Sequence, residues 1–365
     1  AVVGAIPRAY SLCRCKESQR MTHGQRQRGC FLAGIVAALV LVTRMAAAEA
    51  PRLALPIDCT VGKTCWIMSY VDHDPGDGVR DYACGIATYN APPVNRHQGT
   101  DIALRDLGVM RVGVFVRAAA AGKVLGRRDG VVDRNVRILG PTSVAGRECG
   151  NGVRLDHGDG WTTQYCHLRE GSVTVKRGDE VSAGAILGLV GLSGLTEHPH
   201  LHFQLEHNGS IVDPFTGPER KERCGAGSGG LWEATAAASM PYRPTALYNA
   251  GFAAGPPDID AIRDGQTPPA ELKADIPALV LWADIFNVRT GDAIVFLIRN
   301  PEGATVFEHT AKVAENEVRR FVYGGLKRGA AGWALGRYSG EVRLRRGAGP
   351  NGREDIVTAT TVNIQ

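Results

Sequence analysis

The segment HPHLHF (residues 198–203) places three imidazole rings within six residues. In a β-strand, residues two apart share a face and lie about 6.6 Å apart along the chain, so His200 and His202 would face the same side. Leu201 and Phe203 would then point into a core. Two donors on one zinc ion lie about 3.3 Å apart when each is about 2.1 Å from the metal. The spacing therefore suits two metal ligands, and equally one ligand beside a histidine that moves a proton.

An aspartate and a further histidine occur four residues apart in the segment NRHQGTDIAL. On a straight strand His97 and Asp101 would lie about 13 Å apart, too far to share one ion. A turn, which Gly99 would make easy, allows the two side chains to converge. With one histidine of the HLH segment they would supply three zinc ligands and leave a fourth position open, which is typical of a catalytic zinc site.

A third candidate is His167, in the segment TTQYCHL. The HGDG sequence at residues 157–160 predicts the turn of a β-hairpin. Cys149 and Cys166 lie at nearly equal distances from this turn, and Cα atoms opposed at about 4.5–5.5 Å are within reach of a disulfide. We therefore expect a Cys149–Cys166 disulfide. Since neighbouring residues of a strand point to opposite faces, His167 would point away from that disulfide and into a groove.

In their order along the chain, these motifs resemble the lysostaphin/LytM-type zinc metalloendopeptidases of bacterial cell walls. The matching pattern is HxxxD, then YxHL, then HLHF, with a VxxGDxVxxGxxLGxxG run between the last two, over roughly residues 80–216. The resemblance implies zinc bound by His97, Asp101 and His202. It also implies that His167 and His200 flank the metal-activated water and stabilise the transition state.

The same resemblance implies a fold and a function. The fold would be mainly β, with an antiparallel two-sheet core and a groove. The function would be that of an exported zinc-dependent endopeptidase, in which metal-activated water hydrolyses the peptide cross-links of bacterial peptidoglycan. The peptide stems of peptidoglycan would be the substrate, and D-alanyl to diaminopimelate bonds would be the target if the source is a bacterium with two membranes.

The chain departs from the family pattern at two positions. The family usually has Gly-Pro-His-Leu-His-Phe-Glu, whereas here His198 stands in place of the glycine and Gln204 in place of the glutamate. No assigned ligand or catalytic histidine is lost. The changes would alter the groove wall, and hence the peptide accepted. We expect His198 to be an exposed loop histidine.

Three alternatives compete with the peptidase interpretation, and a calcium loop is a further candidate elsewhere in the chain. A non-catalytic relative that binds the cell wall or activates an amidase would have lost zinc ligands. A biotinyl or lipoyl carrier, which VKRGDEVSAGAILG resembles, needs a modifiable lysine on a tight turn. A zinc D-Ala-D-Ala carboxypeptidase would show a longer interval than His97 to Asp101. A calcium loop at DHDPGDG (residues 72–78) would need glutamate where Ala83 stands.

The N-terminal residues 1–48 have the order of a secretory presequence. Arginines precede the apolar run CFLAGIVAALVLV (residues 30–42), and small residues follow it. This run is too short to span a bilayer, which needs about 20 residues. We expect cleavage after Ala48 or Ala50, translation starting at Met21, and no stable membrane insertion afterwards. An uncleaved N-terminal anchor is the alternative.

Charge and cysteine content agree with export. Most of the formal charge of +5 comes from the basic presequence, and without residues 1–48 the chain is near neutral, which argues against nucleic acid as a partner. Six of the nine cysteines follow the presequence, and an even number in an exported chain indicates disulfides. We expect a monomer in the periplasm, in the cell envelope or outside the cell.

Strand-like runs broken by glycine, of which the chain has 46, predict a mainly β protein. The C-terminal segment, which contains DAIVFLIRNPEGATVFEH, has the strand pattern of a small β-sandwich. The expected organisation is a presequence at residues 1–48, a cysteine-containing extension at 49–95, a zinc peptidase domain at 96–216, a Gly/Pro/Ala-rich linker at 217–275 and a C-terminal β domain at 276–365.

Overall fold

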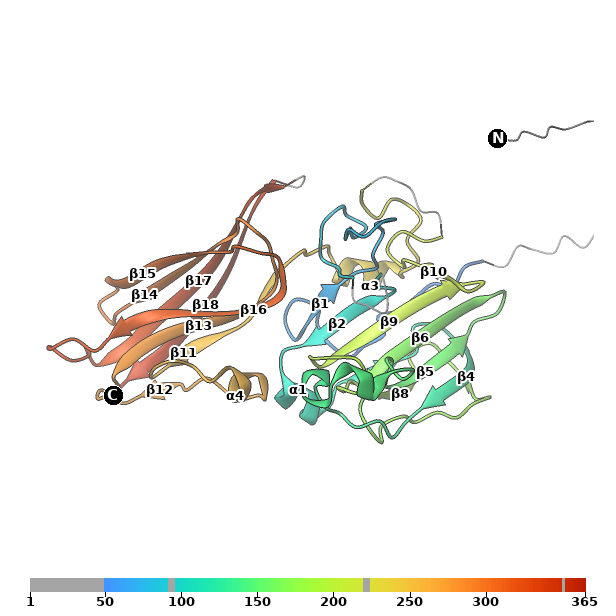
Figure 1. Cartoon of the computed structure of the whole chain (residues 1–365), viewed down its shortest axis with the longest axis horizontal. Coiled ribbons are helices and arrows are strands. Elements are labelled where there is room, and N and C mark those ends of the chain that lie inside the picture. The colour runs from blue at the N-terminus through green and yellow to red at the C-terminus, as the bar shows by residue number, and fades with distance from the viewer. Residues whose placement is uncertain (1–48, 91–95, 219–223, 350–351) are drawn as a thin grey trace, which may run out of the picture. The chain divides into compact units, whose positions relative to one another are not determined.

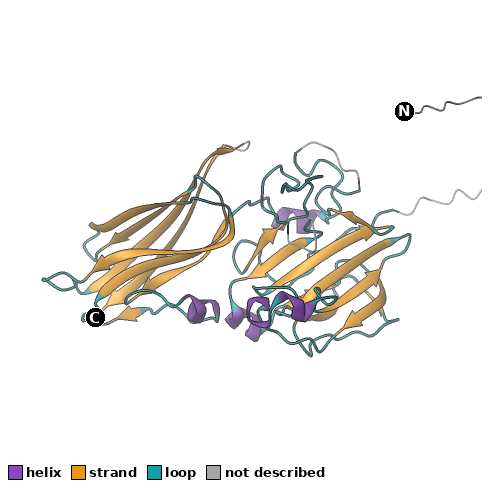
Figure 2. Cartoon of the chain, viewed as in Figure 1, coloured by secondary structure: helices purple, strands orange, loops and turns teal. Residues whose placement is uncertain are grey.

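The computed structural model describes residues 49–90, 96–218, 224–349 and 352–365. The expected presequence, residues 1–48, lies outside the described residues. Within these ranges, no helix is both long and apolar enough to cross a membrane. The described chain is mainly β with antiparallel sheets, which confirms the predicted fold class (Figures 1 and 2).

An eight-stranded antiparallel sheet forms the first part of the fold. Its order is β1-β2-β9-β6-β5-β4-β7, and β10 pairs with β9. Figure 1 shows β9, β6, β5 and β4 side by side. The strands are β1 (Cys65–Ser69), β2 (Thr100–Leu104), β4 (Gly122–Arg128), β5 (Asn151–Asp156), β6 (Trp161–Leu168), β7 (Glu180–Val181), β9 (His200–His207) and β10 (Ser210–Val212).

The alternation of β9 decides which face of this sheet is apolar. Leu201, Phe203 and Leu205 are fully buried in the main core of this part of the fold, whereas His200 and His202, which alternate with them along the strand, lie on the other face. A two-stranded sheet of β3 (Phe115–Arg117) and β8 (Ile186–Leu189) adds apolar side chains to the same core. This part of the fold therefore has the expected two-sheet core, and the polar face of the eight-stranded sheet carries the histidines.

The helices are short and connect the strands, as Figure 2 shows. The side chain of Asp106 accepts a hydrogen bond from the Val109 amide and so caps the first of them, and Asn135 caps the second in the same way. The helices are α1 (Leu107–Val112), α2 (Val136–Leu139), the 3-10 turn η1 (Pro141–Val144), α3 (Ala234–Ser239) and α4 (Ile259–Arg263).

Two further sheets form the β-sandwich expected near the C-terminus, with orders β11-β13-β16 and β12-β18-β17-β14-β15. Alternate apolar residues of both sheets enclose one core, among them Leu281 of β13 and Phe296 of β14. The strands are β11 (Ala246–Ala253), β12 (Glu271–Leu272), β13 (Ala278–Val288), β14 (Ala293–Arg299), β15 (Thr305–Lys312), β16 (Glu317–Lys327), β17 (Gly336–Gly349) and β18 (Gly352–Ile364).

The sandwich begins earlier than the sequence indicated. Strand β11 lies within residues 217–275, for which a linker was expected, and it pairs with β13 over its length. A register shift between Leu247 and Asn249 interrupts its alternation, and its surroundings are rich in Gly, Pro and Ala. For both reasons, this segment lacks the regular alternation that predicts a strand.

Three disulfides join the six cysteines that follow the presequence. The predicted Cys149–Cys166 bond is present. From the sequence alone, the other four cysteines allow three sets of pairings. The structure joins Cys59 to Cys65 and Cys84 to Cys224.

Candidate metal and catalytic site

Strands β2 and β9 bring the HxxxD motif (residues 97–101) and the HxH motif (residues 200–202) together. They pair antiparallel, with Asp101 opposite His202. His97 lies in the turn before β2. A Cβ atom at Gly99 would lie 2.6 Å from the Phe203 carbonyl oxygen and 2.7 Å from the His202 ring. Only glycine fits there, because this turn passes so close to β9.

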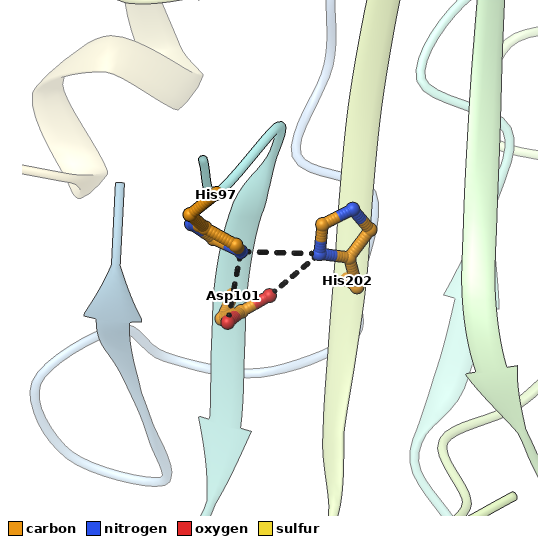
Figure 3. A group of neighbouring side chains, drawn as sticks. All are labelled: His97, Asp101 and His202. Atoms are coloured by element: carbon orange, nitrogen blue, oxygen red, sulfur yellow. Dashed lines mark hydrogen bonds and ion pairs between the residues drawn. The ribbon is translucent and has the colours of Figure 1, made fainter. Parts of the chain in front are cut away.

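The three predicted ligand residues converge on one point (Figure 3). One donor atom from each of His97, Asp101 and His202 lies within 4.8 Å of the others. His97 Nε2 is 3.2 Å from His202 Nδ1 and 3.0 Å from Asp101 Oδ2, and His202 Nδ1 is 2.9 Å from Asp101 Oδ1. Donors that share one zinc ion lie about 3.3 Å apart. The spacing therefore fits a zinc ion bound between them.

Two tyrosines support this cluster, and no sequence pattern points to either. His97 Nδ1 donates a hydrogen bond to the Tyr70 carbonyl oxygen at 2.7 Å. Because a carbonyl can only accept, Nδ1 carries the proton, and Nε2 is directed at Asp101. Tyr89 donates to Asp101 Oδ2 at 3.2 Å and stacks on the His97 ring. On the far side, His202 Nε2 is 3.4 Å from Gln204 Oε1, which leaves Nδ1 facing the cluster.

The charges of the cluster suit a cation. Burial alone would raise the pKa of the Asp101 carboxyl, but His97 and His200 hold that pKa well below its usual range. Burial alone would lower the pKa of His97, but Asp101 more than offsets this and the pKa is raised. The site thus holds a buried carboxylate that attracts positive charge onto His97.

The two predicted catalytic histidines lie beside the cluster. The His167 and His200 ring centroids are 4.6 Å apart, and His167 is 6.1 Å from the His202 ring. His167 Nδ1 donates to the Ser193 carbonyl oxygen, and His200 Nδ1 donates to that of His198. In the neutral form of both rings, Nε2 therefore carries a lone pair. His200 Nε2 is buried without a hydrogen-bond partner and lies 3.5 Å from Asp101 Oδ1.

A bulge in β6, and not simple alternation, places His167. Val153 pairs with Tyr165 and Asn151 pairs with Leu168, so β6 carries one extra residue over this interval. His167 has a φ of 62°, in the left-handed region. Cys166 is paired with His202 across the strands, and so lies on the polar face. The expectation that His167 and the disulfide point to opposite faces is therefore wrong.

The expectation for His198 is also wrong. His198 is only 4% exposed, and its Nε2 donates to the Leu104 carbonyl oxygen at 2.6 Å. Burial, and then the charge of Arg319, lower its pKa well below the usual value. The side chains that bury it come from β11 and β13, about 50 and 90 residues further along the chain. No local pattern could have revealed them.

Comparison with known proteins identifies this part of the chain. Residues 95–214 match the model of peptidase family M23. This range contains all five residues of the candidate site. The chain contains an M23 peptidase domain.

The M23 domain is similar to parts of larger proteins. It is 32% identical over 113 residues to the cell division protein DipM of Caulobacter vibrioides, which is 30% of this chain and 17% of that protein. It is 41% identical over 117 residues to the peptidoglycan DD-endopeptidase ShyA of Vibrio cholerae, which is 32% of this chain and 22% of that protein. The chain thus covers less than a quarter of either relative.

Among solved structures, the catalytic domain of the antimicrobial peptidase lysostaphin from Staphylococcus simulans is 28% identical. The match covers 35% of this chain and 83% of that domain, with a TM-score of 0.25.

Proposed function

We propose that this chain is a zinc-dependent endopeptidase that hydrolyses peptide cross-links of peptidoglycan. The observation that carries the proposal is the convergence of His97, Asp101 and His202 in an M23 domain, with two further histidines beside them. The similarity to ShyA, which is named a peptidoglycan DD-endopeptidase, supports the substrate class.

The donor set is suited to zinc, since two imidazole nitrogens and one carboxylate leave a fourth position for a reactant. When bound, zinc supplies Lewis-acid polarisation of a carbonyl group and an activated water. His97 would bind through Nε2 and His202 through Nδ1, because the other nitrogen of each ring faces an acceptor in the protein. Asp101 would bind through a carboxylate oxygen.

His167 and His200 would move the protons. Burial, and then the nearby His200 and His202, hold the pKa of His167 well below its usual value, so its ring is neutral at neutral pH. Its Nε2 can then accept a proton and pass it on to the leaving amine. His200 presents Nε2 next to the carboxylate of Asp101, where it can stabilise negative charge once it is protonated.

We further propose that the protein acts as a monomer outside the cytoplasm, in the periplasm or the cell envelope. Three disulfides support this location, since such bonds persist in oxidising compartments. The alternative function, a non-catalytic module that binds the wall or activates an amidase, would not need the complete set of five site residues.

The deciding experiment is direct. Purified zinc-loaded protein is incubated with purified peptidoglycan, and the soluble products are analysed by mass spectrometry. The proposal expects cross-linked muropeptides to be converted to monomers, with each cut adding one water. Binding to peptidoglycan with no conversion, at a zinc content of one per chain, would favour the non-catalytic alternative.

A further inference from the structure

The C-terminal sandwich contacts the M23 domain through a small aromatic cluster. Tyr248 of β11 and Phe286 of β13 are buried together with Trp66, Met68 and Ala103 of the first sheet. The Tyr248 and Phe286 rings stack at 3.9 Å with an interplanar angle of 12°. We call these two rings the aromatic platform.

Charged groups hold the platform in place from the sandwich side. Arg319 of β16 donates to the Tyr248 hydroxyl at 2.6 Å. Arg319 and Arg263 both donate to the carboxylate of Asp284, which is only 1% exposed. A buried carboxylate shared by two guanidinium groups is fixed in position, because loss of either partner leaves buried charge uncompensated.

The platform packs on one residue of the loop that leads into β9. The His198 ring lies edge-on to both platform rings, at 5.4 Å from Phe286 and 6.1 Å from Tyr248. Its Nε2 donates to the carbonyl oxygen of Leu104, at the end of the strand that carries Asp101. The ring of His198 is thus fixed between the sandwich and β2.

The backbone of the same residue orients His200. The His198 carbonyl oxygen accepts hydrogen bonds from the Thr196 hydroxyl at 2.9 Å and from His200 Nδ1 at 2.8 Å. His200 Nδ1 also lies 3.1 Å from the Thr196 hydroxyl oxygen, but the carbonyl of His198 is nearer and can only accept, so it puts the proton of neutral His200 on Nδ1 and leaves Nε2 for the site. Pro199, which follows His198, restricts the backbone of His198 to extended conformations. Because the ring and the carbonyl belong to one residue with a restricted backbone, holding the His198 ring in place also holds the His198 carbonyl oxygen in place.

We propose that His198 is a positioning residue through which the aromatic platform of the C-terminal sandwich sets the tautomer and orientation of His200. The sandwich is then a structural support of the active site, beyond any contact that it makes with the cell wall. The kinetic part of this inference rests on the proposed peptidase function, whereas the part that concerns the His200 ring does not.

The test compares four variants of the full-length zinc-loaded chain. His198→Ala removes the ring, Phe286→Leu weakens the platform, and a double variant combines them. Phe296→Leu is the matched control, because Phe296 is equally buried in the sandwich core but lies outside the aromatic cluster. For each variant we would measure zinc content, the melting temperature, and the nitrogen-15 NMR signals of His200.

The wild type should show His200 protonated at Nδ1. His198→Ala and Phe286→Leu should convert this signal into a mixture of tautomers while the zinc content stays at one per chain. Phe296→Leu should lower the melting temperature and leave the His200 signal unchanged. An unchanged Nδ1–H signal in His198→Ala would overturn the inference, as would equal signal changes in Phe286→Leu and Phe296→Leu.

Kinetics with a cross-linked muropeptide dimer give a second readout. His198→Ala should lower kcat at least about tenfold with little change in KM, since a misplacement of about 1 Å in a catalytic group can cost about 10²-fold. The double variant should lose no more than His198→Ala alone, because both changes act on one linkage; fully additive losses would count against it. If the wild type cleaves no dimer but the NMR response appears, the proposed function fails and the positioning role stands.

Discussion

The orientation of each histidine ring in this site follows from the acceptor that its second ring nitrogen meets. His97, His167 and His200 each direct Nδ1 at a backbone carbonyl oxygen, and so present Nε2 to the site. His202 is turned the other way and presents Nδ1. The sequence predicts which histidines take part, because their spacing follows a family pattern. It cannot predict these tautomers, since backbone carbonyls leave no trace in residue type.

His202→Ala should separate the ligand from its neighbours. Removing one of three protein ligands opens the site, so bound zinc and peptidoglycan hydrolysis should both be lost. His200→Ala and His167→Ala should retain zinc and the fold, yet lose at least about 10²-fold in activity, the usual effect of removing one acid–base or oxyanion-stabilising group. Zinc analysis beside muropeptide release distinguishes these outcomes. Full zinc occupancy in His202→Ala would contradict its assignment as a ligand.

The raised pKa of His97 predicts that zinc binding weakens in mild acid. The metal needs unprotonated Nε2, and the folded pKa of His97 lies above its ordinary value of 6.5. As pH falls through that raised pKa, a proton competes with zinc, and apparent affinity should drop about tenfold per pH unit. Asp101 adds no competition, since its pKa is well below the usual range. Chelator competition between about pH 8 and 5.5 measures this. A constant affinity down to about pH 6 would argue that His97 is not a ligand.

At the level of elements, the site depends on the close approach of the Gly99 turn to β9 and on the irregular pairing of β6. The alternation of β9 and the sandwich strands was predictable, since period-two patterns record which face is buried. The bulge in β6 and the strand β11 were not. No residue type near Cys166 and His167 marks the extra residue in β6. In β11 a register shift breaks the alternation of apolar and polar residues.

Gly99→Ala should damage the site through the backbone. The new Cβ would meet the Phe203 carbonyl oxygen at 2.6 Å, so the turn that carries His97 must move away from β9. We expect a loss of about 1–3 kcal/mol in stability and of at least about tenfold in zinc affinity. Gly126→Ala is the control, because nothing lies within 4 Å of a Cβ there. Urea unfolding and zinc titration would test both variants, and equal zinc affinity in the two would refute the argument.

For the whole molecule, covalent links and a buried interface join segments that are far apart in sequence. The Cys84–Cys224 bond spans 140 residues, and His198 meets side chains of β11 and β13. Neither could be predicted, because pairing between distant segments depends on the completed fold. The predicted Cys149–Cys166 bond spans only 17 residues around one hairpin, where local geometry is sufficient.

The long disulfide should contribute more to stability than a short one. In the chain-entropy account, closing a loop of 140 residues stabilises by about 5 kcal/mol, and closing the six-residue Cys59–Cys65 loop by about 2 kcal/mol. The Cys84→Ala/Cys224→Ala variant should therefore unfold at a lower urea concentration than Cys59→Ala/Cys65→Ala, at a comparable slope. The reverse order of midpoints would show that local strain or packing outweighs loop length.

The Cys84–Cys224 bond also determines how the protein responds to cleavage of its own backbone. All five residues of the candidate site lie between these two cysteines. A single proteolytic nick at an exposed turn within that interval would leave both fragments covalently joined. The nicked chain would migrate as one band on a non-reducing gel and separate into two bands only after reduction. A preparation of this protein judged intact without a reductant can therefore contain cut molecules.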